Sequence, residues 1–262
     1  MISSTAPLRA VVFDMDGTLV DNMSFHNEAW VALARKLGLS MTAEDFQNHH
    51  AGKKNEEILP ALLGRPLAHD ELNRLAEEKE NHYRTLYRPH LRLHRGAEAF
   101  ISRLREARIP TAIATAAPQG NRELVLDGLG IRPLFTRVVG AEEVTRGKPW
   151  PDIFLAAAKA LGVEPSTCLA FEDAILGVRS ARDAGMPVVG VTTTTSAEQL
   201  REAGAQWIVP DFTTLPPELE ARLFPRARGL RHRPARVPPR GEAPTPPAAA
   251  PGAPEEPARA PW

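Results

Sequence analysis

Phe-Asp-Met-Asp-Gly-Thr-Leu-Val-Asp-Asn, residues 13–22, is the stretch that decides the fold of this 262-residue chain. It continues a short apolar run, LRAVVF, of the kind found in strands buried on both faces of a parallel sheet. Asp14 and Asp16 follow that run two residues apart, and Gly17 allows a tight turn. We therefore expect both carboxylates to lie near one point at the end of the first strand.

The same stretch has two other interpretations. Asp-x-Asp-Gly resembles the start of a calcium-binding loop, and aspartate is also a common turn residue. Counted from Asp14, a calcium loop needs glycine at its sixth position and glutamate at its twelfth, where this chain has Leu19 and Phe25. The calcium loop is thereby excluded, whereas an ordinary turn remains open on these residues alone.

Five later apolar runs have the composition of further buried strands. They are PTAIAT (110–115), LFTRVVG (134–140), TCLAF (167–171), MPVVGV (186–191) and QWIVP (206–210). From residue 96 onward they alternate with helical patterns, several of which end in glycine. This alternation predicts an α/β fold with a doubly wound, mainly parallel sheet.

Residues 22–94 interrupt the alternation, because they contain helical patterns and no convincing strand. Apolar side chains recur every four residues at Phe25, Ala29, Leu33 and Leu37. A later helix is marked by Leu72, Leu75, Tyr83 and Leu86. We predict an inserted α-helical cap at 22–94, placed over the carboxyl end of a core formed by residues 1–21 and 95–224.

The last stretch, residues 225–262, holds 11 of the 25 prolines and seven arginines against three glutamates, with almost no aliphatic periodicity. This composition predicts a disordered tail. Residues 238–247 could adopt an extended polyproline conformation, so a weak partner that recognises proline-rich segments is an open alternative for the tail.

Charge and composition exclude several classes of partner. The 32 basic and 32 acidic residues give a formal net charge of zero, which provides no basic field for non-specific nucleic-acid binding. Cys168 is the single cysteine and lies in an apolar run, so we expect a buried thiol in a reducing compartment. Residues 1–10 lack the apolar core of a signal peptide, and no stretch is apolar enough to span a bilayer. We expect a cytoplasmic protein without a membrane partner.

Four motifs in a fixed order carry a family resemblance. They are FDMDGTLVDN (13–22), Thr115 at the end of a strand, Gly-Lys-Pro (147–149) and the acidic pair Glu172-Asp173 at the end of another strand. Together they resemble the haloacid dehalogenase (HAD) superfamily over about residues 8–215. The helical insert resembles the small cap of the β-phosphoglucomutase-like branch. The fold, magnesium use and residue roles below are what this resemblance implies.

The resemblance makes Asp14 the nucleophile that attacks phosphorus and forms an aspartyl-phosphate. Asp16 is then the general acid and base. Mg²⁺ is held by a carboxylate oxygen of Asp14, the backbone carbonyl of Asp16 and a carboxylate of the acidic pair, with Asp173 favoured as the direct ligand and Glu172 behind it or as an alternative. Taken alone, the pair could also be an acidic helix start that faces the positive end of the helix dipole.

Two more residues acquire roles from their place in the motif order. The hydroxyl of Thr115 and the backbone N–H groups after it, from Ala116 onward, would hold the phosphoryl oxygens. Lys148 would neutralise charge on Asp14 and on the phosphoryl group. Dehalogenases of the superfamily lack the second aspartate and need no metal. Because Asp16 and the acidic pair are both present, the resemblance implies a phosphatase acting on a small phosphorylated substrate.

The cap offers weaker candidates. His26 matches a histidine near the hinge of the related caps, although an ordinary helical histidine is equally expected there, and Lys53 or Lys54 could reach an anionic substrate. Mutases of this branch carry an arginine and a Ser-Lys-Asn-like run where this chain has Asn55 and residues 117–119, Ala-Pro-Gln. A second phosphate would lack charge-assisted hydrogen bonds, so we rank hydrolysis above mutase activity. A catalytically idle binding protein is a third hypothesis.

Overall fold

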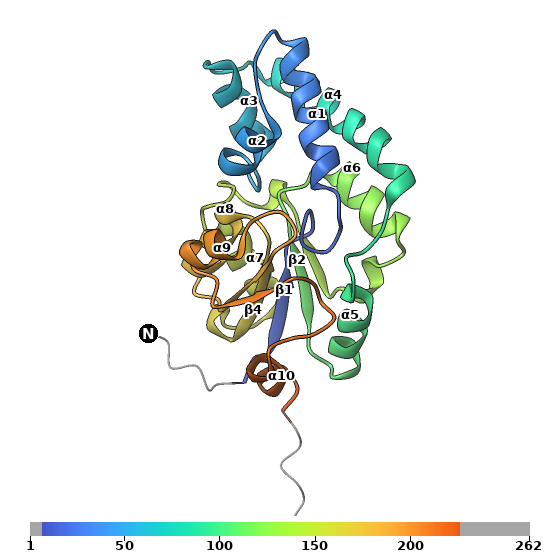
Figure 1. Ribbon diagram of the computed structural model, residues 1–262, viewed down its shortest axis with the longest axis vertical. Helices are drawn as coiled ribbons and strands as arrows, with labels where there is room; N and C mark the ends of the chain where they lie inside the picture. The colour runs from blue at the N-terminus through green and yellow to red at the C-terminus, as the bar shows by residue number, and fades with distance from the viewer. Residues whose placement is uncertain (1–6, 226–262) are drawn as a thin grey trace, which may run out of the picture. The chain divides into compact units, whose positions relative to one another are not determined.

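The computed structural model describes residues 7–225, and a six-stranded parallel sheet forms its core (Figure 1). The strands follow the order β3-β2-β1-β4-β5-β6 across the sheet. The second and third strands are therefore added on one side of β1, and the fourth to sixth on its other side. Their bounds are β1 (Ala10–Phe13), β2 (Thr111–Ala114), β3 (Arg137–Val139), β4 (Cys168–Glu172), β5 (Val188–Val191) and β6 (Trp207–Val209). This arrangement confirms the predicted doubly wound α/β fold.

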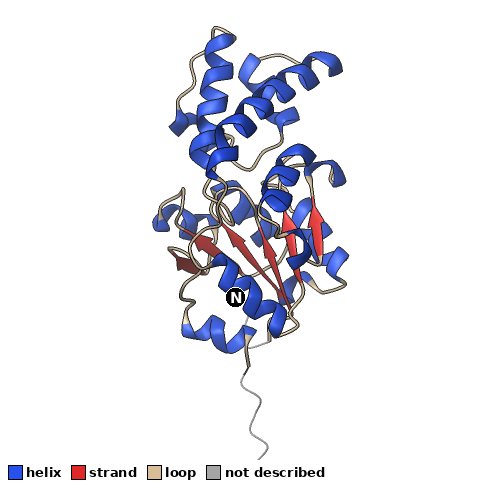
Figure 2. Cartoon of the chain, turned by 90° about the vertical axis from the view of Figure 1, so that its right-hand side faces the viewer, coloured by secondary structure: helices blue, strands red, loops and turns tan. Residues whose placement is uncertain are grey.

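Helices cover both faces of the sheet (Figure 2). Buried side chains of α5 (Ala97–Glu106) and α10 (Pro217–Leu223) pack against one face. The same face receives α6 (Gln119–Arg122), which continues into a π-helical turn, η2 (Glu123–Asp127). The opposite face is covered by α7 (Asp152–Leu161), α8 (Ile175–Asp183) and α9 (Ala197–Ala203). Short 3₁₀ turns complete the core: η3 (Arg132–Leu134), η4 (Ala141–Glu143) and η5 (Pro165–Thr167).

The central strand β1 shows why continuous apolar runs mark the middle of the sheet. Val11 and Phe13 belong to the apolar cluster on one face, whereas Ala10 and Val12 belong to the cluster on the other. Successive side chains of a strand point to opposite faces, so a strand covered on both sides must be apolar at every position. All four residues of β1 are buried.

The two edge strands depart from the expected burial on both faces. Arg137 in β3 is exposed, and Trp207 and Ile208 in β6 are half-buried. An edge strand has a neighbour on one side only, and a short or charged edge hinders pairing with other chains. The runs 134–140 and 206–210 therefore do form strands, but the expectation of full burial was wrong for them.

Between β1 and residue 90 every regular element is helical, and these helices form the inserted cap (Figure 1). They are α1 (Met23–Lys36), α2 (Ala43–His49), α3 (Asn55–Leu63), α4 (His69–Tyr87) and the short turn η1 (Arg88–His90). The cap has an apolar core of its own, which includes Trp30, Phe46, Ile58, Leu59 and Leu75. A separate core allows the cap to move as a unit relative to the sheet.

The chain enters and leaves the cap through two adjacent segments. Val20 pairs with Leu93 in an isolated antiparallel bridge, and the His94 N–H donates to the carbonyl of Leu19 at 2.8 Å. The two connections between the cap and the core therefore lie side by side, an arrangement in which a hinge needs few changes of backbone dihedral angle.

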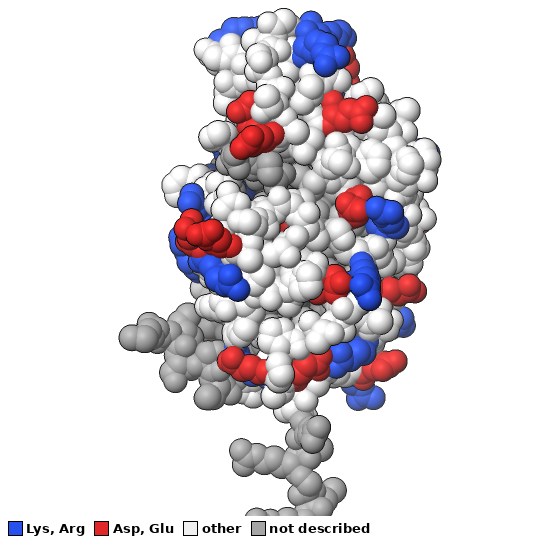
Figure 3. Space-filling model, viewed as in Figure 1, with Lys and Arg blue, Asp and Glu red and all other residues white. Residues whose placement is uncertain are grey.

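The surface of the described residues carries no extended field of one sign on the face shown in Figure 3, where acidic and basic side chains are interspersed. Within residues 7–225 no helix is both long and apolar enough to cross a membrane. Residues 226–262, which contain nearly all of the predicted disordered tail and the possible partner-binding segment, lie outside the described residues.

Four phenylalanines form an aromatic cluster beneath the carboxyl ends of β1 and β4. Phe13 stacks on Phe171 with ring centroids 5.3 Å apart. Phe100 on α5 meets both of them edge-on, at 6.0 and 5.4 Å, and stacks on Phe212 at 5.9 Å. Because Phe13 and Phe171 precede Asp14 and Glu172, this cluster fixes the two strand ends that carry carboxylates.

We predict that Phe100→Ala lowers the free energy of unfolding by about 3–5 kcal/mol, because the side chain is 2% exposed and its removal leaves a cavity among three other rings. Urea unfolding would measure the change. The matched control is Leu155→Ala, since Leu155 is 41% exposed and its loss should cost within about 0.5 kcal/mol. Equal losses in the two variants would contradict a stabilising role for the aromatic cluster.

Candidate active site

Three carboxylates meet where β1 and β4 end. Asp14 directly follows β1, and its N–H donates to the carbonyl of Phe171 at 3.0 Å. Glu172 is the last residue of β4, and Asp173 follows it. One side-chain oxygen from each of Asp14, Glu172 and Asp173 lies within 4.8 Å of the other two, and all three residues are buried. The parallel pairing of the two strands therefore brings together residues more than 150 positions apart.

Lys148 places its ammonium group among these carboxylates. Its Nζ donates to Asp14 Oδ1 at 2.6 Å and to Glu172 Oε1 at 2.5 Å, and the side chain is almost fully buried. Burial alone would lower the pKa of Lys148, but the two carboxylates outweigh it and hold this pKa above the ordinary value. The lysine therefore stays charged between the two carboxylates that it contacts.

The three buried carboxylates of Asp14, Glu172 and Asp173 form a suitable metal site. Burial raises the pKa of Asp14 well above its ordinary value, against the opposing effect of Lys148. Burial and the neighbouring Glu172 raise the pKa of Asp173 to about 7. Such shifts show that burial and the neighbouring carboxylates disfavour the ionised forms, which Lys148 offsets only in part. Hard carboxylate oxygens are the ligands that Mg²⁺ prefers, so the residues present fit this ion.

Glu172 and Asp173 differ in how their oxygens are engaged. Glu172 Oε2 accepts hydrogen bonds from the N–H groups of Asp173 and Ala174, both at 3.0 Å, at the start of α8. Asp173 instead accepts from two hydroxyls, those of Thr18 and Thr194. A hydroxyl can rotate away from an incoming cation, whereas a backbone N–H cannot. Asp173 is therefore the more available ligand, while Glu172 is held by the backbone N–H groups that precede α8.

The loop after β1 depends on a glycine. Gly17 has φ = +82°, and a Cβ atom there would lie 2.2 Å from Asp173 Oδ2. Its N–H donates to Asn22 Oδ1 at 3.0 Å, and Asn22 Nδ2 donates to Asp16 Oδ1 at 2.5 Å. Asn22 thus closes the turn and orients the Asp16 side chain.

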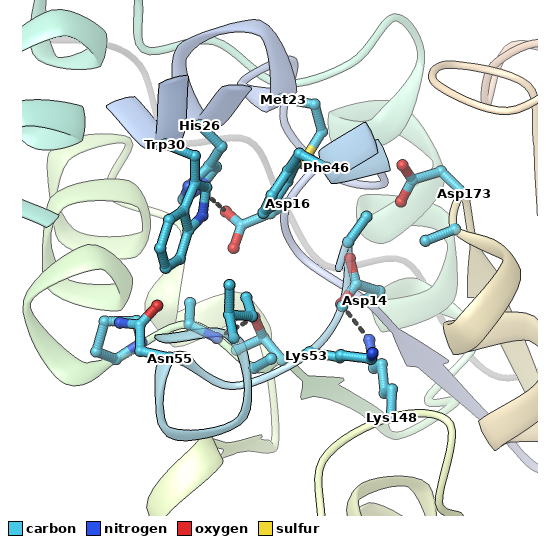
Figure 4. Close-up of a pocket in the computed structure, with 18 of the residues that line it drawn as sticks. Asp14, Asp16, Met23, His26, Trp30, Phe46, Lys53, Asn55, Lys148 and Asp173 are labelled. Atoms are coloured by element: carbon cyan, nitrogen blue, oxygen red, sulfur yellow. Dashed lines mark hydrogen bonds and ion pairs between the residues drawn. The ribbon is translucent and has the colours of Figure 1, made fainter. Parts of the chain in front are cut away.

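Asp16 faces the cap rather than the carboxylate cluster (Figure 4). Its Oδ1 lies 3.8 Å from His26 Nε2, beyond hydrogen-bond distance, and His26 Nδ1 lies 2.9 Å from Lys79 Nζ. Burial and the Lys79 charge lower the pKa of His26, so its ring is neutral. An ammonium group only donates, so His26 Nδ1 accepts and Nε2 carries the proton toward Asp16. The expected metal contact of Asp16 is its backbone carbonyl, which these side-chain positions do not test.

Thr115 and Ala116 follow β2 and line the same pocket as Asp14. Thr115 is buried, and its Oγ1 accepts a hydrogen bond from the Ala117 N–H at 3.1 Å. The hydroxyl hydrogen of Thr115 is therefore left to donate to another oxygen in the pocket. The structure thus brings Thr115, Ala116, Lys148 and the acidic residues to one pocket.

The cap closes this pocket from the other side. Trp30, Phe46 and Ile58 supply an apolar wall, and Lys53 and Asn55 supply polar groups from the loop before α3 and from its start. The cavity is about 60 Å³ in volume, which holds only a few water-sized groups. We therefore expect the cap to move when a larger substrate binds.

The cap also forms hydrogen bonds with the segment that precedes Lys148. Lys54 Nζ donates to the carbonyl of Val144 at 2.8 Å, and the Gly147 N–H donates to Glu57 Oε1 at 3.1 Å. A Cβ atom on Gly147 would lie 2.4 Å from Glu57 Oε2, so a side chain here would force the Glu57 carboxylate to move. The closed cap and the lysine segment are thus joined by direct hydrogen bonds.

Four residues that line the pocket or contact Asp173 were not predicted from the sequence. Lys79 and Glu80 lie in a run of charged residues, which is typical of a solvated helix, yet both are buried and line the pocket. A signal was present for Lys79, because it lies four residues after Leu75 and four before Tyr83, on the apolar face of α4. Thr18 and Thr194 carried no comparable signal, since their contact with Asp173 depends on how three loops meet.

Comparisons with known proteins agree with this geometry. The chain is 30% identical over 199 residues to a chloroplastic 5-amino-6-(5-phospho-D-ribitylamino)uracil phosphatase of Arabidopsis thaliana, a match that covers 76% of this chain and 52% of the relative. The chain therefore spans about half the length of that relative. It is 34% identical over 187 residues to the fructose-1-phosphate phosphatase of Escherichia coli, which covers 69% of this chain and 95% of the relative.

A solved structure and a family model point the same way. The β-phosphoglucomutase of Clostridium difficile superposes with a TM-score of 0.71 at 29% identity, covering 82% of this chain and 97% of that one. The family model described as haloacid dehalogenase-like hydrolase matches residues 8–185. The predicted resemblance is confirmed: the chain belongs to the haloacid dehalogenase-like hydrolases.

Proposed function

We propose that this chain is a magnesium-dependent phosphatase that hydrolyses a small phosphorylated metabolite, such as a sugar phosphate, through a phosphorylated Asp14. The observation that carries the proposal is the buried meeting of Asp14, Lys148 and Asp173 at the mouth of the sheet, beneath a cap that encloses the space in front of them. The names of the Arabidopsis and Escherichia coli relatives, both phosphatases, support the same reaction class.

In the first step an oxygen of Asp14 attacks phosphorus, and the bond from phosphorus to the substrate oxygen breaks. Asp16 donates a proton to that leaving oxygen. In the second step a water oxygen attacks the phosphorus of the aspartyl-phosphate while Asp16 takes the proton of the water. Inorganic phosphate leaves, and Asp14 is restored with Asp16 again protonated.

The remaining residues hold charge and geometry during both steps. Lys148 stays positively charged and contacts Asp14 Oδ1, where negative charge is transferred. The Thr115 hydroxyl is free to donate to a phosphoryl oxygen. When bound at Asp14 and Asp173, Mg²⁺ would supply charge neutralisation for the phosphoryl oxygens. Trp30, Phe46 and Ile58 exclude bulk water when the cap is closed.

A second candidate function is a phosphosugar mutase, in which the phosphoryl group returns to another hydroxyl of the sugar. The likeness to the β-phosphoglucomutase structure favours it. A mutase must hold two phosphates at once, and Asn55 and residues 117–119 place no positive charge where the mutases have an arginine and a lysine. We therefore rank hydrolysis first.

We predict that Asp14→Asn reduces hydrolysis of p-nitrophenyl phosphate on the order of a thousandfold or more, because an amide does not replace the attacking carboxylate. The wild type should release nitrophenol in the presence of Mg²⁺ and lose this activity in chelator. A near-normal rate for Asp14→Asn would contradict the covalent mechanism. Absence of any wild-type hydrolysis would favour an idle binding protein.

We predict that Mg²⁺ raises the melting temperature of the wild type, because a ligand that binds the folded state stabilises it. Asp173→Asn should remove most of that increase, measured by thermal unfolding with and without Mg²⁺. The matched control is Asp183→Asn, since Asp183 on α8 is exposed and pairs only with Arg182 among the described residues. If Asp173→Asn and Asp183→Asn showed the same increase as the wild type, Asp173 would not be a metal ligand.

We predict that β-glucose 1-phosphate, supplied with a trace of glucose 1,6-bisphosphate, yields more free phosphate than glucose 6-phosphate. The reason is that Asn55 and residues 117–119 carry no positive charge where the mutases hold the second phosphate. Coupled assays for glucose 6-phosphate and for inorganic phosphate would measure the two products in one reaction. Predominance of the isomer would reverse the ranking of phosphatase over mutase.

A further inference from the structure

We infer that Asn55 and Glu80 form a specificity element that accepts a hydroxyl group of the substrate and rejects a second phosphate. This inference rests on the proposed phosphatase function and names the class of substrate, a hydroxylated monophosphate. The element lies across the pocket from the carboxylate cluster, as the positions of Asn55 and Asp173 in Figure 4 show.

The first observation is that the chain itself saturates the Glu80 carboxylate. Its Oε1 accepts from Asn55 Nδ2 at 2.8 Å and from Lys79 Nζ at 3.1 Å. Its Oε2 accepts from Asn121 Nδ2 at 2.7 Å and again from Lys79 Nζ at 3.1 Å. A carboxylate has about four acceptor positions, so none is left for a ligand. Glu80 therefore acts on the substrate only through the groups that it holds.

The charge state of Glu80 is also set by these contacts. Burial would raise the pKa of its carboxyl, but Lys79 and the amides of Asn121 and Asn55 lower it to about 2. The carboxylate is therefore ionised at neutral pH. Lys79 has no donor left for a ligand, because its three ammonium hydrogens are donated to His26 Nδ1 and to the two oxygens of Glu80.

The ionised carboxylate fixes the orientation of the Asn55 amide. A carboxylate only accepts hydrogen bonds, so Asn55 must turn its NH₂ group toward Glu80. The carbonyl oxygen, Oδ1, is then the other polar end of this amide. Within residues 7–225 that oxygen takes part in no hydrogen bond, although Asn55 lines the pocket. An acceptor is thus the group that Asn55 has left for a ligand.

An acceptor at this place selects among substrates by elementary chemistry. A sugar hydroxyl can donate to the Asn55 carbonyl, and this hydrogen bond would be lost with a substrate that lacks the hydroxyl. A phosphate dianion presents oxygens that only accept, so it cannot form a hydrogen bond with the Asn55 carbonyl oxygen. Lys53 is the cation on this loop that a second phosphate could reach, so the rejection needs a direct test.

The test compares kcat/KM for phosphate release from three probes. Propyl phosphate has no hydroxyl, and fructose 1,6-bisphosphate has a second phosphate. The hydroxylated probe is whichever of fructose 1-phosphate, glucose 6-phosphate and glycerol 3-phosphate the wild type hydrolyses fastest. We expect the wild type to prefer this probe over each of the other two by about tenfold or more. Ratios within one protein sample do not depend on the active fraction.

Two variants separate the roles of the pair. Asn55→Leu removes the acceptor at similar size, so the preference for the hydroxylated probe over propyl phosphate should fall about tenfold. Glu80→Gln introduces an NH₂ group that can donate to the Asn55 carbonyl, which frees the Asn55 NH₂ to face the pocket. Discrimination against the bisphosphate should then fall by a similar factor. If Glu80→Gln does not fold, as circular dichroism would report, Asn55→Leu and the wild-type ratios still decide.

The matched control is Glu56→Gln, because Glu56 is exposed on α3 beside Asn55, and both of its ratios should match those of the wild type within about twofold. The inference is overturned if Asn55→Leu leaves the hydroxyl preference within twofold of the wild type. It is also overturned if the wild type hydrolyses the bisphosphate as readily as the monophosphate. Failure of the underlying phosphatase function is distinguishable, since the wild type would then release no phosphate from any probe with Mg²⁺ present.

Discussion

The crowding of three carboxylates around one ammonium group, at the ends of β1 and β4, is the constraint on which the rest of the structure depends. Charges so deeply buried are costly unless they are paired and hydrogen-bonded. Lys148, two helix-start N–H groups and two threonine hydroxyls supply that compensation from four separate segments. The aromatic cluster beneath holds the two strand ends in register. The proposed reaction requires these carboxylates to lie close together, whereas their burial destabilises the fold. A bound cation would be compatible with both, because it would offset the buried negative charge.

The cap shows a second use of buried charge. Glu80 and Lys79 lie inside the protein, yet every hydrogen-bonding position of both groups is filled, so their burial leaves no unsatisfied atom on Glu80 or on the ammonium. The contacts of Glu80 join α4 to α3 within the cap and to α6 in the core. Polar contacts of this kind can be exchanged for water when the cap opens, whereas a large apolar contact would resist opening. The interface is therefore suited to repeated movement.

Much of this could be predicted from the sequence, for a physical reason. Continuous apolar runs marked the strands, and parallel strands bring their carboxyl ends to one edge, so the places of Asp14 and the acidic pair followed from topology. The edge strands were the exception, because periodicity does not tell how many neighbours a strand has. Lys79 and Glu80 were missed because adjacent charged residues on a helix are usually solvated. Lys148 required the order of motifs, since it lies 134 residues from the Asp14 oxygen that it contacts.

The hydrogen bonds that join Lys54 and Glu57 to the segment before Lys148 link the position of the cap to the way in which that segment is held. If the cap lifted away, residues 144 and 147 would lose both of these hydrogen bonds, and Asp14 would become more accessible to solvent. The segment that carries Lys148, whose ammonium group contacts Asp14, would then be less firmly held than when the cap covers it. A phosphoryl donor too small to contact the cap would then meet a pocket in which the Lys148 segment lacks these two hydrogen bonds. For the proposed phosphatase, coverage of the pocket by the cap would therefore be a condition of reaction.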